Sequence, residues 1–156
     1  GRGVAETLKL PKGGDVTLVD DAYNANPESM RAAIEGFARR PGRKIVALGE
    51  MRELGEGSAA LHAGLATSIL AAKVSAAVLS GGEMKHLADA LTARDQSMRV
   101  VHVTGPAEAA EQVKSWLEPG DAVLIKGSNA SGMAKVGTAL RQMSESAASS
   151  QKASGA

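Results

Sequence analysis

The chain has 156 residues, a formal net charge of +1 at pH 7 and no cysteine. This length suits one domain that buries most of its apolar surface, and the lack of cysteine excludes disulfides and thiolate metal sites. Acids and bases are interspersed, so no nucleic-acid or membrane partner is indicated. No apolar run approaches the roughly 18 residues of a membrane span, and we expect no membrane insertion.

Apolar runs alternate with segments of helical periodicity along the chain. In chain order the sequence predicts a strand at 16–19, a helix at 27–39, a strand at 44–48, a helix at 58–73, a strand at 76–79, a helix at 83–93, a strand at 99–103, a helix at 106–117, a strand at 122–125 and a helix at 132–143. Asn26 and Ser58 are the predicted caps of the first two helices. An additional short strand is predicted from Thr7 to Leu10.

Strands that are nearly continuous apolar runs, separated by helices, indicate a mostly parallel sheet with helices on both faces. We therefore predict a doubly wound α/β domain over residues 1–143. The fold is Rossmann-like, but the sequence has no Gly-x-Gly-x-x-Gly after a strand, no Walker-type phosphate loop and no Gly-x-Ser-x-Gly elbow. From Ser144 the periodicity is lost, and we expect 144–156 to be a disordered tail.

Three polar loops follow predicted strands, at 20–26, 49–55 and 126–131. In parallel α/β sheets, ligands bind outside the carboxyl ends of the strands. The loops after the third and fourth strands are short, and the opposite edge of the sheet has only turns. This asymmetry predicts a ligand site formed by the three polar loops.

The first of these loops has more hydrogen-bonding groups than a connection needs. It contains Asp20, Asp21, Tyr23, Asn24 and Asn26, and one of the three aromatic residues of the chain is this tyrosine. The structural alternative is that an aspartate caps the turn and Asn24 adopts a left-handed conformation.

The other polar groups also have structural alternatives. Lys126-Gly-Ser before a helix resembles a phosphate-binding turn, although Gly-Ser turns at helix starts are common. Glu50 and Glu53 could be solvated carboxylates without a role. The three histidines, His62, His86 and His102, show no metal-ligand spacing, so we predict surface or satisfied, partly buried histidines and no metal site.

Three segments resemble motifs of the Mur ligases. They are the run from Asp20 to Met30, the run from Leu48 to Gly55 with His62 downstream, and the run from Leu124 to Ser128 with Met133. Together they resemble the carboxyl-terminal domain of the branch that joins D-alanyl-D-alanine to UDP-N-acetylmuramoyl-tripeptide. The resemblance covers about residues 1–142, and Gly1-Arg2-Gly3 resembles the end of a preceding central domain.

The resemblance implies a cytoplasmic, monomeric enzyme of peptidoglycan synthesis. ATP would phosphorylate a precursor carboxylate, and the amine of D-alanyl-D-alanine would attack the acyl phosphate. The partners would be a central ATPase domain and an amino-terminal UDP-binding domain of the same polypeptide. ATP and Mg²⁺ would be the cofactors, with Mg²⁺ not held by this domain, and the isolated chain would be inactive.

The resemblance also assigns residues. Arg2 would reach the ATP phosphates, Asp21 the ribose, and Tyr23 would face the joint between ATP and the acceptor. The substrate-binding residues would be Asn24, Asn26, Lys126, Gly127, Ser128 and Ser131. No residue is an evident general base, so the catalytic residues stay unassigned, and the contribution of the domain would be positioning and electrostatics.

Three positions depart from the family pattern: Glu50 replaces an Asp, Ala22 a Ser or Cys, and Asn129 an Arg. The last change leaves Lys126 as the cation for the dipeptide carboxylate. One alternative is the corresponding domain of another Mur or folylpolyglutamate-type ligase. A second is an α/β binding module without catalysis.

Overall fold

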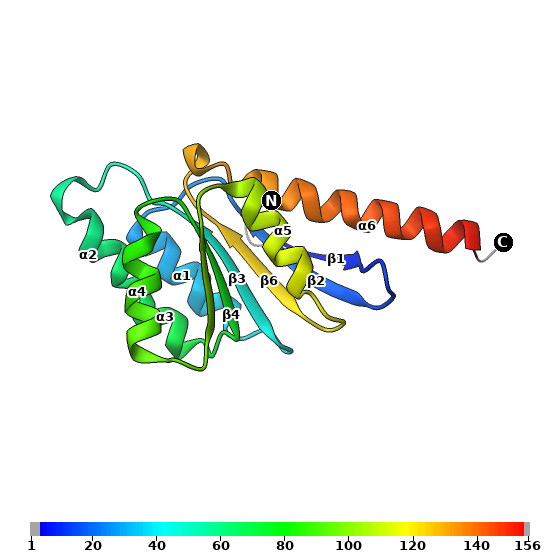
Figure 1. Ribbon diagram of the computed structural model, residues 1–156, viewed down its shortest axis with the longest axis horizontal. Coiled ribbons are helices and arrows are strands. Elements are labelled where there is room, and N and C mark those ends of the chain that lie inside the picture. The colour runs from blue at the N-terminus through cyan, green and yellow to red at the C-terminus, as the bar shows by residue number, and fades with distance from the viewer. Residues whose placement is uncertain (1–3, 155–156) are drawn as a thin grey trace.

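A computed structural model of the chain describes residues 4–154, and the Arg2 assignment lies outside them. Within this part, one six-stranded sheet has the order β1-β2-β6-β3-β4-β5 (Figure 1). Its strands are β1 (Ala5–Lys9), β2 (Asp15–Asp21), β3 (Lys44–Gly49), β4 (Ala76–Ser80), β5 (Arg99–Val103) and β6 (Ala122–Lys126). All neighbours pair in parallel except β1, which is antiparallel to β2. The short strand predicted from Thr7 to Leu10 is β1, an antiparallel edge strand that begins and ends slightly earlier.

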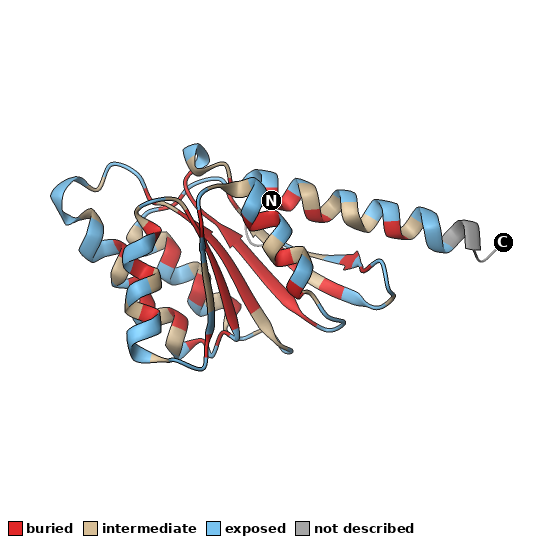
Figure 2. Cartoon of the chain, viewed as in Figure 1, coloured by how far each residue is buried: buried red, intermediate tan, exposed pale blue. Residues whose placement is uncertain are grey.

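Helices cover both faces of the sheet, which confirms the predicted fold class. They are α1 (Pro27–Phe37), α2 (Ser58–Ala63), α3 (Leu65–Ala71), α4 (Met84–Arg94), α5 (Pro106–Trp116) and α6 (Ala134–Ser154), with short 3₁₀ helices η1 (Gly55–Gly57) and η2 (Asn129–Ser131). One core cluster joins α1, α3 and α4 to the sheet, and a second joins α5 and α6 to the opposite face. The central strands are buried between these layers (Figure 2).

The start of α1 agrees with its sequence signals. Asn26 has an extended backbone, and its side-chain oxygen accepts a hydrogen bond of 2.8 Å from the Ser29 amide. The Asn26 amide in turn donates to Ser29 Oγ at 3.0 Å, and Pro27 occupies the first helical turn. This reciprocal capping box fixes where the first polar loop ends and the helix begins.

The helix predicted at 58–73 is instead two helices, α2 and α3, which meet at Gly64. Ser58 is the first residue of α2, whose N-cap is Gly57, and the Ser58 hydroxyl lies 3.3 Å from His62 Nδ1. A glycine in a helix interior weakens it relative to alanine, which favours a break at this position.

The last helix is longer than predicted, because α6 continues to Ser154. The expectation of a disordered tail from residue 144 is wrong for 144–154. Ser144 Oγ accepts a hydrogen bond of 2.9 Å from the Lys9 amide, and Gln151 Nε2 donates to the Leu10 carbonyl at 3.2 Å. Ala147 is buried. The helix is thus anchored beside β1 and the turn that follows it (Figure 1).

None of the helices in the described part of the chain is both long and apolar enough to cross a membrane.

Candidate functional site

The three polar loops meet at the carboxyl edge of the sheet, as predicted. Strand β6 lies between β2 and β3, so its last residue, Lys126, is in register with Asp21 on one side and with Leu48 on the other. The loop after β6 is therefore flanked by the other two loops.

Lys126 ties the first loop to the third. Its side chain is 3% exposed, and Nζ donates hydrogen bonds to Asp21 Oδ2 at 3.0 Å and to the Asn24 carbonyl at 2.8 Å. A buried ammonium needs such partners because burial removes its hydration. The Asp21 side chain is still 20% exposed. Lys126 thus orients the carboxylate of Asp21 and the backbone of the loop.

Asp20, its neighbour, belongs to the opposite face of the sheet. Its carboxylate accepts hydrogen bonds from Arg141 Nη2 at 2.9 Å and from the Ala22 amide at 3.1 Å. A Cβ on Gly137 would lie 2.4 Å from Asp20 Oδ2, so a larger residue there would displace the Asp20 carboxylate. Asp20 therefore caps the turn, as the structural alternative predicted, and joins β2 to α6.

Arg141 also binds Glu6 of β1. Its Nε donates to Glu6 Oε2 at 3.0 Å and its Nη2 to Oε1. Hydrogen bonding to the guanidinium lowers the pKa of Glu6, and the same bonds, with those to Asp20, raise the pKa of Arg141. One arginine thereby joins β1, β2 and α6.

The rest of the first loop is partly structural and partly open. Asn26 uses its side-chain oxygen as the cap of α1, and Asn24 Oδ1 accepts from the Ala25 amide at 2.9 Å. The left-handed alternative for Asn24 is wrong, because the positive φ values of described non-glycine residues belong to Glu53 and Lys73. The Tyr23 residue is 68% exposed, so its ring is largely accessible.

Glu50, in the second loop, is not a solvated carboxylate. Its Oε2 accepts a hydrogen bond of 2.8 Å from the Glu83 amide, just before α4. A negative charge at the N-terminus of a helix interacts favourably with the helix dipole. Its backbone carbonyl accepts from the Ser128 amide at 3.0 Å. A Cβ on Gly81 would lie 2.6 Å from the Glu50 carboxyl carbon. Glu50 thus connects the second loop to the third and to α4.

His62 is fully buried and binds the same loop from the other side. Its Nε2 accepts a hydrogen bond of 3.0 Å from the Met51 amide, so Nδ1 carries the ring proton. That proton points to the Ser58 carbonyl, 2.8 Å away. His62 is therefore a satisfied histidine, but it is fully buried and not partly buried as predicted.

The other two histidines are exposed and also have partners: His86 Nε2 lies 3.3 Å from Glu83, and His102 Nε2 lies 2.6 Å from the Gly81 carbonyl. Among the described residues, no group of three or more His, Cys, Asp or Glu side chains is placed to hold a metal.

The third loop is a compact turn in front of α6. Ser128 caps η2, its Oγ accepting from the Ser131 amide at 3.1 Å, and Ser131 Oγ donates to the Ser128 carbonyl at 2.6 Å. A Cβ on Gly127 would lie 2.6 Å from Ser131 Oγ and 3.0 Å from the Gly49 Cα. Only glycine lets the second and third loops approach this closely.

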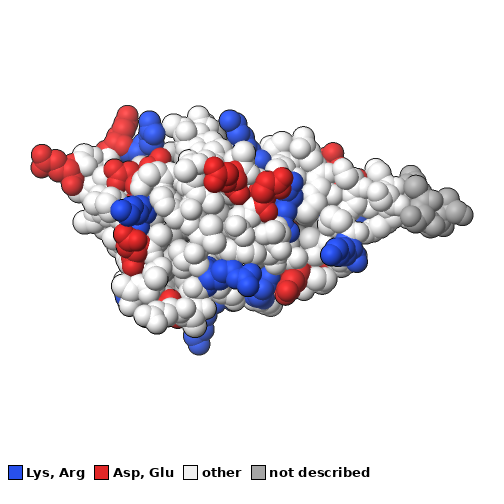
Figure 3. Space-filling model, viewed as in Figure 1, with Lys and Arg blue, Asp and Glu red and all other residues white. Residues whose placement is uncertain are grey.

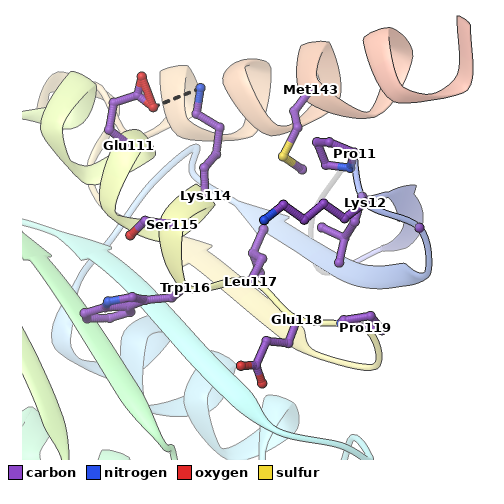
Figure 4. Close-up of a pocket in the computed structure, with 12 residues that line it drawn as sticks. Pro11, Lys12, Glu111, Lys114, Ser115, Trp116, Leu117, Glu118, Pro119 and Met143 are labelled. Carbon is purple, nitrogen blue, oxygen red and sulfur yellow. Dashed lines mark ion pairs between the residues drawn. The ribbon is translucent and has the colours of Figure 1, made fainter. Parts of the chain in front are cut away.

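A large hollow lies at the opposite edge of the sheet. It measures about 870 Å³ and is lined by Leu10, Trp116, Met143, Lys12 and Lys114, among others (Figure 4). Lys114 is paired there with Glu111 at 3.0 Å. No predicted site residue lines it. A smaller hollow of about 230 Å³ under α1 includes Asp21 in its wall.

On the face shown in Figure 3, acidic and basic side chains are interspersed.

Residues 6–129 match the family described as Mur ligase, glutamate ligase domain. The chain belongs to this family. It is 35% identical over 149 residues to the UDP-N-acetylmuramoyl-tripeptide–D-alanyl-D-alanine ligase of Mycobacterium tuberculosis, with 83% of the chain and 29% of the relative covered. The Escherichia coli enzyme of the same name is 31% identical over 127 residues, with 80% and 27% covered.

Solved structures agree with these relatives. The MurF ligase of Thermotoga maritima, determined in complex with ADP, superposes with a TM-score of 0.72 and 26% identity over 94% of the chain and 32% of that protein. The chain spans less than a third of the length of the curated relatives it matches, 29% in the first case.

Proposed function

We propose that the chain is the carboxyl-terminal domain of an ATP-dependent ligase that adds D-alanyl-D-alanine to UDP-N-acetylmuramoyl-tripeptide. The observation that carries the proposal is the joining of the three family motifs at one edge of the sheet, through Lys126 and Glu50. Relatives at 35% and 31% identity bear the name of this enzyme. The remaining domains, which would carry the ATPase machinery and the UDP site, are partners in the same polypeptide.

In this proposal ATP converts the tripeptide carboxylate to an acyl phosphate, and the dipeptide amine attacks the carbonyl carbon and expels phosphate. The domain closes over the central domain, excludes water from the acyl phosphate and positions the amine. Mg²⁺ accompanies ATP and is held outside this domain. No residue of the described part of the domain is assigned as a general base.

Asp21 and Tyr23 are the proposed contacts to ATP. Asp21 has a fixed carboxylate with part of its surface exposed, and Tyr23 is largely exposed beside it in sequence. Asn24 shares the Lys126 anchor, and Asn26 sets the start of α1. Arg2, proposed to contact the phosphates, precedes the described residues.

Gly127, Ser128 and Ser131 are the proposed dipeptide loop. The sequence prediction that Lys126 pairs with the dipeptide carboxylate stays a prediction. The ammonium already has two partners, so we propose that Lys126 acts mainly by holding Asp21 and Asn24 in place. If so, substitution of Lys126 raises the KM for ATP as well as that for the dipeptide, whereas a direct contact affects the dipeptide alone.

The proposal is tested by assaying the full-length protein for phosphate release with UDP-N-acetylmuramoyl-tripeptide and ATP. We expect release to depend on D-alanyl-D-alanine, and D-glutamate, L-lysine and folate with glutamate to be inert. Turnover with one of those substrates instead would assign the chain to another branch. The 156-residue chain alone is the control and should release no ADP.

A further inference from the structure

One peptide group in the second loop makes hydrogen bonds through both its carbonyl and its amide. The carbonyl of Glu50 and the amide of Met51 belong to the same peptide unit. The carbonyl accepts from the Ser128 amide at 3.0 Å, and the amide donates to His62 Nε2 at 3.0 Å. No described peptide bond is cis, and in a trans peptide these two groups point in opposite directions. This planar unit therefore spans from His62 to the third loop.

We infer that His62 is a positioning residue for the third loop, acting through this peptide group. The inference rests on the proposed function in one respect, the assignment of Ser128 to the dipeptide. His62 does not itself reach the third loop by any hydrogen bond of the described structure. Its effect is transmitted by the orientation of one peptide plane.

The ring of His62 is itself rigidly held. It is fully buried, and Nδ1 donates to the carbonyl of Ser58, one helical turn earlier in α2. With Nδ1 protonated, Nε2 has a lone pair directed at the Met51 amide. Met51 is also buried, with 3% of its surface exposed, so water cannot readily replace the ring as an acceptor.

Two substitutions separate the two nitrogens of the ring. In His62→Gln the side-chain oxygen reaches the position of Nε2 and can accept from Met51, but the bond to Ser58 is lost. In His62→Asn the shorter amide reaches the position of Nδ1 and can donate to Ser58, but nothing accepts from Met51. Both variants place an uncharged amide in the same buried site, so they are matched controls for polarity.

The first measurement is steady-state kinetics of the full-length protein. We expect His62→Asn to raise the KM for D-alanyl-D-alanine about tenfold, the cost of one unpaired buried amide, with the KM for ATP unchanged. His62→Gln should stay within about threefold of wild type, since its acceptor remains. Equal losses in the two variants, or rescue by Asn rather than Gln, would overturn the inference.

The second measurement does not depend on catalysis. Hydrogen exchange of the same proteins, followed on peptides that contain the Met51 and Ser128 amides, should be faster for both peptides in His62→Asn and unchanged in His62→Gln. A peptide from β5 serves as the control for general destabilisation. Faster exchange at Met51 without a change at Ser128 would overturn the inference. The expected exchange pattern with an unaltered dipeptide KM would support the positioning role and refute the dipeptide assignment of the loop.

Discussion

Asp20 and Asp21 are adjacent and chemically identical, yet they serve opposite sides of the molecule. Successive side chains of a strand point to opposite faces. Asp20 meets Arg141 on the α6 side, whereas Asp21 meets Lys126, which also holds the Asn24 carbonyl. The partner of Asp20 joins elements of the fold, and the partner of Asp21 orders a loop at the proposed site. The difference shows that the face of the sheet, and not the residue type, decides which partner each carboxylate meets.

The largest effect is expected on the Asp21 side, from Lys126→Ala. This change removes a buried cation and leaves Asp21 and the Asn24 carbonyl without their donor. We expect a loss of about 3 kcal/mol in the free energy of unfolding, at the lower end of the range for broken buried pairs because Asp21 is partly exposed. Denaturant titration measures it. Lys126→Met, which keeps the length and apolar contacts of the side chain, is the control and should lose less.

Turnover measurements distinguish the proposed ribose contact of Asp21 from an effect of this residue on stability. Asp21→Asn keeps an acceptor for Lys126 but removes the charge proposed to bind the ribose in the closed state. In the full-length protein we expect turnover to fall about ten- to a hundredfold, with initial ATP binding changed much less. Asp20→Asn is the matched control and should leave turnover per folded molecule near wild type. Comparable turnover losses in both variants would show that the two aspartates do not differ in their effect on turnover.

Removal of the Arg141 guanidinium tests the Asp20 side of the comparison. Arg141→Ala removes the donor to Asp20 and Glu6, and we expect a loss of about 1–2 kcal/mol, because the Arg141 side chain is 34% exposed and solvent screens its pairs. Thermal unfolding measures it, and turnover of the remaining folded protein should be unchanged. Arg141→Lys should recover part of the loss, since it keeps the charge without the planar fork. A stability equal to that of wild type would show that this network holds nothing together.

The smallest expected effect is a pH dependence of the stability that the Arg141–Glu6 pair contributes. Arg141 lowers the pKa of Glu6 below its ordinary value of 4.5 in the folded state. The stabilisation is therefore fully present above pH 4.5 and is lost as the pH falls through the lowered value. The stability difference between wild type and Arg141→Ala should shrink below this pH, by a fraction of about 1 kcal/mol for such an exposed pair. Glu6→Gln is the control and should make the difference nearly independent of pH in this range.

The sequence predicted the alternation of elements, the start of α1 and the three loops at one edge, because these depend on local patterns and on the geometry of parallel strands. It did not predict the partners of Lys126. These follow from β6 lying next to β2, and strand order is not visible in apolar runs. Nor did it distinguish Asp21 from a surface residue. Substitutions that strip Lys126 of its acceptor will therefore affect stability as well as turnover.

The wrong prediction of a disordered tail from residue 144 also arises from contacts that the sequence does not show. Residues 144–154 lack apolar periodicity and hold three alanines against five serines, so local propensity does not predict a helix, and their anchors are single contacts to β1 and the turn after it. Such contacts depend on the presence of the antiparallel edge strand, which was itself only weakly indicated. The break at Gly64 was missed because an isolated glycine in a helical pattern is tolerated at a cost of about 1 kcal/mol, so its presence does not by itself predict an interruption.

The position of β6 has a consequence for synthesis on the ribosome. Among the described strands it is the last to be made, yet it lies in the middle of the sheet, between β2 and β3. Until it emerges, β1 with β2 and β3 with β4 and β5 are separate pieces with no strand to join them, and their unpaired inner edges are open to wrong partners. Completion of the domain must therefore await residue 126, late in its translation.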